Sequence, residues 1–259
     1  MALTNKTIAS TYGDILQADN SGSGRTANGT TIKDGLGQST ALTLGQNKLH
    51  VKPSTDQTDA VVIETSGGTD LLVVDSTNSA VKVGTSQTYA NTQVQRFATH
   101  DLQPVADTHH IMQVDGHILS SSTMANFGTG TDPATTYTVG DSETSANSLV
   151  ASAWYIPVAI TIDEVRVIGA GEAADTVNFH LFSYTMASGT GTDAGDLSAG
   201  TLLAHNGSTL TTGADRVTTT TLTVDSGSVA ADKVVFAFIE NVGATTDLTA
   251  QLIVKYHYQ

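Results

Sequence analysis

Short apolar runs, each followed by turn-forming residues, recur between residues 41 and 84 and restrict what this part of the chain can fold into. In order along the chain, they are ALTLG at 41–45, KLHVK at 48–52, AVVIE at 60–64, LLVVD at 71–75 and AVKVG at 80–84. Runs this short, rich in Val, Leu and Ile and separated by Gly, Pro, Asn or Asp, are typical of β-strands joined by turns. The sequence therefore predicts an all-β unit built from short strands.

These strands are too few and too short to enclose a core of their own, because a small sheet buries little apolar surface. Aromatic residues make up only 5% of the chain, so large rings do not compensate. We therefore expect other copies of the chain to cover the strands, with three chains around one axis forming a β-prism-like trimeric shaft over residues 41–90. The predicted core of that shaft consists of Leu42, Leu44, Leu49, Val51, Val61, Ile63, Leu72, Val74, Val81 and Val83.

Net charge and residue usage exclude several classes of function. The formal net charge is −14 and the 11 lysines and arginines are scattered, so no nucleic-acid partner is expected. The chain has 0 cysteines, which excludes disulfides, thiolate catalysis and cysteine metal sites. No apolar run approaches the ~20 residues of a membrane span, so we expect no membrane insertion. The opening MALTNKTIAS lacks the basic and apolar regions of a signal peptide, and none is expected.

The strand pattern is clearest from residue 149 onward. The predicted strands are LVASAWYI at 149–156, ITIDEVRVI at 160–168, TVNFHLFSY at 176–184, TLLAH at 201–205, RVTTTTLTV at 216–224, KVVFAFIEN at 233–241 and LTAQLIVKYHY at 248–258. The last run alternates apolar and polar residues, whereas VVFAFI is apolar on both faces, as in a central strand. Residues 149–259 are therefore predicted to form an antiparallel β-sandwich of jelly-roll-like type.

The two remaining segments carry weaker patterns. Residues 1–40 are polar and rich in Gly, Ser, Thr and Asn, which is typical either of a flexible tail or of an extended anchor that orders on a partner. If it is an anchor, its isolated apolar side chains would dock, namely Leu3, Ile8, Tyr12, Ile15 and Leu16. Residues 91–148 are predicted to be a linker or neck with short strands, including one that ends near Leu119 and a helical turn around Val94 and Phe97.

Histidines and a glycine-rich loop are the candidate binding features. Four histidines lie between residues 100 and 117 among several aspartates, and His109, His110 and His117 would be the candidate ligands of a metal on a trimer axis. Without a known metal-binding spacing, however, we predict no metal and no cofactor. Residues 187–200 read as a long exposed loop that could touch a surface through Thr190, Thr192, Asp193 and Asp196.

Catalytic patterns are missing from the sequence. There is no GxSxG nucleophile elbow, and the abundance of Ser and Asp makes any serine triad uninformative. Asp163 and Glu164 could supply a carboxylate pair, but neighbouring residues on a strand point to opposite faces. The chain is therefore predicted not to be an enzyme.

Several segments together resemble a family of viral proteins. They are ALTNKTIASTYGDILQ at the start, LLVVDSTNSAVKVG, ADTHH, FGTGTDPATTYTV, AWYIPVAITIDEVRV and the ending IVKYHYQ. In these segments the chain resembles fibre-like virion structural proteins of marine tailed bacteriophages, found as capsid decorations, head fibres or short tail fibres. The likeness runs along nearly the whole chain and carries no catalytic motif.

The resemblance implies a homotrimer that is assembled in the host cytoplasm and carried on the virion. It implies an N-terminus attached to a major capsid or tail protein and a C-terminal β domain that faces outward, with a host cell-surface glycan as a further partner. Two other readings stay open: a bacterial carbohydrate-binding or adhesion module, and a glycan-degrading virion enzyme. An adhesion module would be expected to carry a leader, and a glycan-degrading enzyme a longer catalytic region.

Overall fold

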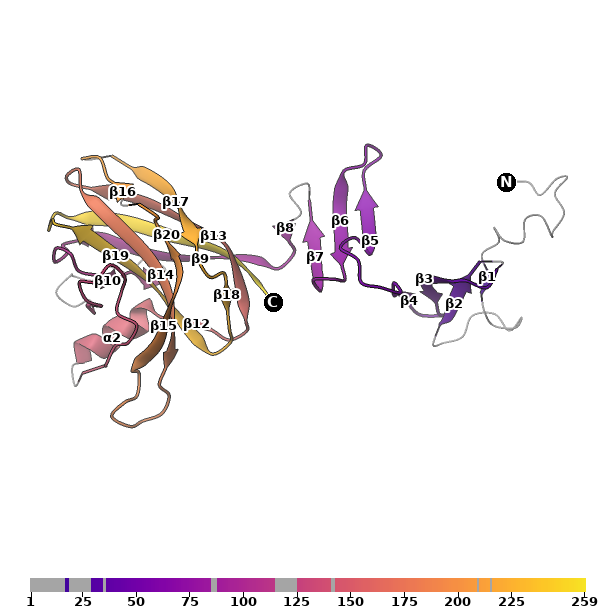
Figure 1. The fold of residues 1–259 in the computed structure, drawn as a ribbon, viewed down its shortest axis with the longest axis horizontal. Helices are drawn as coiled ribbons and strands as arrows, with labels where there is room; N and C mark the ends of the chain where they lie inside the picture. The colour runs from indigo at the N-terminus through magenta and orange to yellow at the C-terminus, as the bar shows by residue number, and fades with distance from the viewer. Residues whose placement is uncertain are drawn as a thin grey trace. The chain divides into compact units, whose positions relative to one another are not determined.

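The computed structural model describes residues 17–18, 29–34, 36–84, 88–114, 125–140, 143–208, 210–214 and 216–259. The chain divides into two compact units, Met1–Ala90 and Asn91–Gln259. Both are built from antiparallel strands, so the predicted all-β class is confirmed (Figure 1).

The first unit begins with a four-stranded antiparallel meander. Its strands are β1 (Gln17–Ala18), β2 (Thr30–Lys33), β3 (Ser39–Leu44) and β4 (Leu49–Val51). The turn between β2 and β3 is closed by Asp34, whose Oδ1 accepts hydrogen bonds from the backbone N–H of Leu36 and Gln38 at 3.0 and 2.8 Å. Gly37 occupies the left-handed region at φ 82° in this turn, where a side chain would be strained.

A second four-stranded meander follows in the same unit. It comprises β5 (Val61–Glu64), β6 (Asp70–Asp75), β7 (Ala80–Val83) and β8 (Thr88–Tyr89). In Figure 1, β5, β6 and β7 lie side by side in a single layer, in agreement with their antiparallel pairing. The short runs of the sequence therefore form the strands they predict.

The second unit is a β-sandwich whose two sheets join at one edge. The β14 sheet contains β10 (His110–Ile111), β12 (Trp154–Ile156), β19 (Lys233–Val242), β14 (Thr176–Met186), β16 (Leu210–Thr211) and β15 (Leu197–His205). The β13 sheet contains β17 (Thr218–Val224), β13 (Ile160–Gly171), β18 (Ser228–Val229), β20 (Leu248–Tyr258), β9 (Thr92–Leu102) and β11 (Gln113–Val114). Pairing of β15 with β17 connects the sheets, and the predicted C-terminal sandwich is confirmed.

The core lies between these two sheets. On β20, alternate residues from Leu248 to Tyr256 are buried, as the alternating sequence of that strand predicts. Across from them, Phe179 of β14 reaches to Gly169 of β13, where an added Cβ would lie 3.9 Å from the phenyl ring. These contacts fill the interior with aliphatic side chains and a few large rings.

Three predictions for the segments around the start of the sandwich are wrong. The residues around Val94 and Phe97 form no helical turn, because β9 pairs with β20 from Thr92 to Leu102 and buries Phe97 in the core. The linker predicted for residues 91–148 is instead part of the second unit. A helix, α2 (Glu143–Ser152), occupies the start of the run predicted as a strand from residue 149. The strand predicted to end near Leu119 lies outside the described residues.

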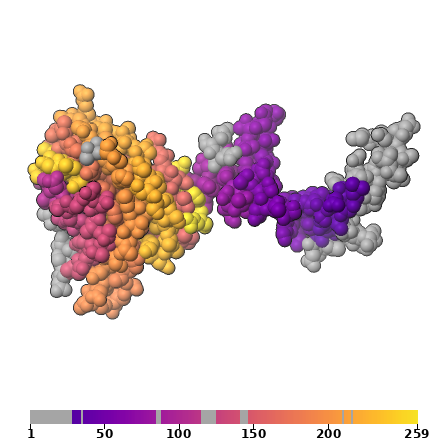
Figure 2. Space-filling model, viewed as in Figure 1, coloured from indigo at the N-terminus to yellow at the C-terminus, as the bar shows by residue number. Residues whose placement is uncertain are grey.

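A segment that we call the strap, residues 126–139, crosses the outer face of the β14 sheet. At one end, the Phe127 N–H donates to the His109 carbonyl, before β10, and the His109 N–H donates to the Gly128 carbonyl, both at 2.9 Å. At the other end, Tyr137 exchanges two backbone hydrogen bonds with Leu197 at the start of β15. In Figure 2, the region around the strap and α2, drawn in crimson, forms part of the surface of this unit.

The strap explains why β19 is apolar on both faces. One face of β19 lies against the β13 sheet, and the other carries Phe236 and Phe238 beneath the strap. The Phe127 ring packs on Phe238 at 4.8 Å and stacks on Tyr137 at 4.6 Å between ring centroids. The Tyr184 hydroxyl donates to the Ala134 carbonyl at 2.9 Å. The second unit therefore has a small aromatic core outside the main one.

Candidate functional site

The second meander has one face built from aliphatic side chains, which we call the aliphatic face. Strand register places Val61 opposite Val74 and Ile63 opposite Leu72, and then Leu72 opposite Val83 and Val74 opposite Val81. Directly paired residues point to the same side of a sheet, so all of them share one face. The aliphatic face consists of Val61, Ile63, Leu72, Val74, Val81 and Val83.

Much of the aliphatic face is open to solvent. The exposed fractions are 53% for Ile63, 41% for Val81 and 42% for Val83, while Leu72 and Val74 are partly buried. Isolated exposed aliphatic residues are common on proteins, but a contiguous patch across three strands indicates a surface that binds something. Covering each of these side chains would contribute roughly 1.5–3 kcal/mol before the cost of ordering.

The opposite face of the same meander combines apolar and polar side chains: Val62 lies opposite Val73, which is buried, and a polar cluster forms around Asp75. The Asp75 side chain has no exposed surface and accepts hydrogen bonds from the Asn78 backbone and side-chain nitrogens at 2.9 and 2.8 Å. Lys82 Nζ donates to the same carboxylate at 2.9 Å and lies 5.9 Å from the centre of the Tyr89 ring. The hydrogen bonds from Asn78 and Lys82 lower the pKa of Asp75 to about 2, and the carboxylate raises the pKa of Lys82. The polar groups of this cluster therefore satisfy one another.

The first meander also gathers aliphatic side chains on one face. Register places Leu42 opposite Val51 and Leu44 opposite Leu49, so these four predicted shaft residues share one face. Leu49 is 64% exposed and Val51 is also exposed. Of the ten predicted shaft residues, four therefore share one face of the first meander and six share the aliphatic face of the second. The structure contains a single chain, so the trimer itself stays a prediction.

The remaining predicted binding residues do not form one site. Leu3, Ile8, Tyr12, Ile15 and Leu16 lie outside the described residues. Thr190, Thr192 and Asp193 are exposed in the turn between β14 and β15, which spans residues 187–196. Asp196 is only partly exposed, because its Oδ1 accepts a hydrogen bond from the Val139 N–H at 2.8 Å at the end of the strap. That residue fixes the strap to the turn.

The predicted histidine candidates are buried where they are described. His109 and His110 are 0% and 3% exposed, and His117 lies outside the described residues. His109 Nε2 lies 3.6 Å from Glu240 Oε2, and the His110 Nε2 accepts a hydrogen bond from the Val105 N–H at 3.0 Å. Burial lowers the pKa of both imidazoles. Among the described residues, no group of three or more histidines or carboxylates is arranged to hold a metal ion.

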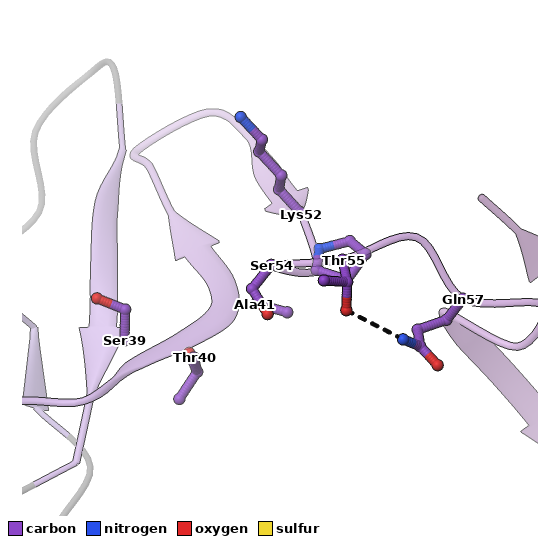
Figure 3. A pocket seen from close by; sticks show the side chains of 8 residues that line it. Ser39, Thr40, Ala41, Lys52, Ser54, Thr55 and Gln57 are labelled. Atoms are coloured by element: carbon purple, nitrogen blue, oxygen red, sulfur yellow. Dashed lines mark hydrogen bonds between the residues drawn. The ribbon is translucent and has the colours of Figure 1, made fainter. Parts of the chain in front are cut away.

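An open groove of about 480 Å³ lies beside β3 in the first unit (Figure 3). Ser39, Thr40 and Ala41 of β3 line one side, and the segment after β4, including Thr55 and Gln57, lines the other. Thr55 Oγ1 accepts a hydrogen bond from the Gln57 amide at 3.2 Å. Lys52 is the ionisable side chain among the lining residues. The groove can offer hydroxyl and amide contacts but no paired acid and base.

A second open hollow, of about 310 Å³, lies at one end of the sandwich. Its lining includes the carboxylates of Asp101, Glu172 and Asp247 together with the guanidinium of Arg216. Mixed charges on an open surface are normally solvated. The aliphatic face is therefore the better-defined candidate site.

Comparisons with known proteins add distant likenesses. No known protein family matches the chain, and no curated protein matches its sequence. A structure of infectious bursal disease virus, Gx strain, is similar over 83% of this chain and 38% of that chain, at 9% identity and a TM-score of 0.27. A crystal structure of the T13 particle of the same virus is similar over 68% and 42%, at 11% identity and a TM-score of 0.20. This chain thus spans less than half of the length of either neighbour.

The helices were also examined for a segment that could span a membrane. No helix in the described part of the chain is long and apolar enough to cross a bilayer.

Proposed function

We propose that this chain is a non-enzymatic structural protein of a virus particle, a homotrimeric fibre or decoration on the capsid or tail. The observation that supports the proposal best is the aliphatic face of the second meander. A thin sheet with an open aliphatic face is stable in water only when another surface covers that face. Three copies around an axis can cover one another with identical faces, and cyclic assemblies close in this way.

The sandwich in this proposal is the displayed part of the fibre. It has its own aromatic and aliphatic core, so it does not need the meanders to bury its apolar residues. Its exposed turn between β14 and β15, with Thr190, Thr192 and Asp193, is available for contact with a host-surface glycan. The resemblance to virion fibre proteins supports the same orientation, with the N-terminal 40 residues attached to a capsid or tail protein.

Incorporation into particles tests the virion role. Particles of the virus that encodes the chain would be purified with the full chain or with a variant lacking residues 2–20, and the protein detected by mass spectrometry. We expect the full chain in particles and the deletion variant absent from them, although the deletion variant still forms trimers. Absence of the full chain from particles would overturn the virion role, and normal incorporation of the deletion variant would overturn the N-terminal attachment.

A further inference from the structure

Three imidazoles form a row at the boundary between the strap and the β14 sheet. His109 precedes β10, His180 lies on the outer face of β14, and His205 ends β15. The ring centroids of His109 and His180 are 4.9 Å apart, and those of His180 and His205 are 6.4 Å apart. His109 and His180 are 0% and 4% exposed, so the first two rings are packed against each other out of water.

The row contacts the first half of the strap, between Phe127 and Asp132. The His109 N–H donates to the Gly128 carbonyl and the His109 carbonyl accepts from the Phe127 N–H, both at 2.9 Å. His180 Nε2 lies 3.4 Å from Oδ1 of Asp132, a strap residue. One histidine therefore belongs to the strap's anchor and the other to the surface that the strap covers.

We propose that the strap, residues 126–139, is a pH-sensitive cover that acid releases from the aromatic outer face of the β14 sheet. Protonation of His109 and His180 would place two positive charges 4.9 Å apart in a buried site. Charges of the same sign at that distance repel, and each also loses its hydration while it stays buried. Opening the strap relieves both costs because the imidazoles reach water.

Carboxylates near the row oppose this effect only in part. Glu240 of β19 faces His109 at 3.6 Å, but its Oε2 also accepts a hydrogen bond from the Asn178 amide at 2.8 Å. Asp132 on the strap is 53% exposed, so solvent screens its attraction for His180. Asp225, after β17, pairs with His205 Nδ1 at 2.7 Å and not with the two buried rings.

His110 adds to the acid sensitivity of the same anchor. Its Nε2 accepts a hydrogen bond from the Val105 N–H at 3.0 Å, so this nitrogen is unprotonated when the strap is closed. Its Nδ1 is buried and has no hydrogen-bond partner in the structure. A proton on Nε2 would break the bond to Val105 and charge a third buried ring beside β10.

The sign of the pH dependence follows from the closed state. Burial first, and then the neighbouring His109 and His205, lower the pKa of His180 to about 3. An imidazole released to water titrates near 6.5, so the open strap binds more protons than the closed strap below that pH. Closure is therefore favoured fully above pH 6.5 and progressively less as the pH falls toward 3. At pH 5, His180 alone would raise the opening constant by about 30-fold.

Hydrogen exchange on the full chain tests the proposal. Protection of the Phe127, Ala134 and Tyr137 amides, corrected for intrinsic exchange rates, would be measured at pH 7.5 and pH 5.0. We expect strap protection to fall by roughly 30-fold or more, while the amides of β13 and β20 stay within about threefold. Unchanged strap protection, or an equal loss in β13 and β20, would overturn the proposal.

Substituting the histidines tests whether they, and not other groups that bind protons in acid, release the strap. The double variant His109→Gln/His180→Gln should keep most of its strap protection at pH 5.0, because two of the buried protonation sites are removed. His50→Gln, on the exposed strand β4 of the other unit, serves as the control and should respond to pH like the unmodified chain. If the double variant loses strap protection at pH 5.0 as the unmodified chain does, these histidines are not the trigger. If that variant does not fold, the comparison of the unmodified chain at two pH values still decides the proposal.

Discussion

At the scale of single residues, Asp75 fixes the hairpin formed by β6 and β7. Its buried carboxylate accepts from both nitrogens of Asn78 and from Lys82, and Ser79 in the same turn adopts a left-handed backbone at φ 53°. A strained turn residue of this kind persists only when its surroundings hold it in place. The polar link of the sequence DLLVVDSTNSAVKVG is thus an ordered turn organised by one acid.

The lowered pKa of Asp75 predicts how this hairpin responds to acid. Because its pKa falls from 3.8 to about 2, the stabilisation that the carboxylate gives is complete above pH 3.8 and is lost as the pH falls through 2. Asp75→Asn should unfold more readily at pH 7 and should lose less of its remaining stability between pH 4 and pH 2. Thermal unfolding at several pH values measures this, with the exposed Asp59→Asn as control. Identical pH profiles for Asp75→Asn and the unmodified chain would contradict the assignment.

Gly200 of β15 lies against the strap at a point that leaves no room for a side chain. A Cβ at this position would lie 2.7 Å from the Thr135 Cα and 2.7 Å from a ring carbon of Tyr184. Gly200→Ala should therefore destabilise the second unit by about 1–3 kcal/mol, since packed backbone cannot move away easily. Gly191→Ala, in the exposed turn with nothing within 4 Å of its Cβ, is the matched control and should change stability by less than about 0.5 kcal/mol. Urea unfolding of both variants measures the difference, and equal stabilities would contradict it.

At the scale of elements, the two faces of β5 provide a matched test of assembly. Ile63 belongs to the aliphatic face, while its neighbour Val62 points to the opposite side of the sheet. Ile63→Asp would place an unpaired carboxylate in the proposed contact between chains, at a cost of several kcal/mol. We expect Ile63→Asp to dissociate the assembly and Val62→Asp to preserve it, as measured by sedimentation velocity. An intact assembly with Ile63→Asp would show that this face is not the contact.

The sequence predicted a strand well when its partner strands are close to it in the sequence, and poorly when they are distant. Period-2 alternation located β20 at its observed bounds, and the short runs of the first unit predicted β3 to β7, because neighbouring strands pair in sequence order. For β9 the signal was weak, since its partner β20 lies more than a hundred residues away. Only the tertiary fold makes Thr92–Leu102 a strand.

The order of the strap and the pairing of the histidines beside it could not be predicted from sequence patterns. Residues 126–139 belong to the segment predicted as a linker or neck, and their order comes from contacts of Phe127 and Tyr137 with a sheet formed much later in the chain. His180 looked like a polar residue within an apolar strand, and its pairing with His109 needed the strap to be placed first. The Asx-type spacing of Asp75 and Asn78 was a local signal that could have identified the turn.

At the scale of the whole molecule, the two units bury their apolar residues in different ways. The sandwich encloses large rings such as Phe179, Tyr184 and Phe236 within one chain. The meanders instead present Leu49, Ile63 and Val81 to solvent and enclose few side chains of their own. This contrast is the basis for proposing that the first unit folds completely only when it associates with other copies.

The molar mass of the purified full chain tests this central claim most directly. Light scattering coupled to size exclusion, at micromolar concentration and pH 7.5, would measure it without labels or partners. The trimer predicts three times the chain mass of 26.8 kDa, about 80 kDa. A stable, fully folded species of 26.8 kDa under these conditions would contradict the claim that other copies of the chain cover the aliphatic face.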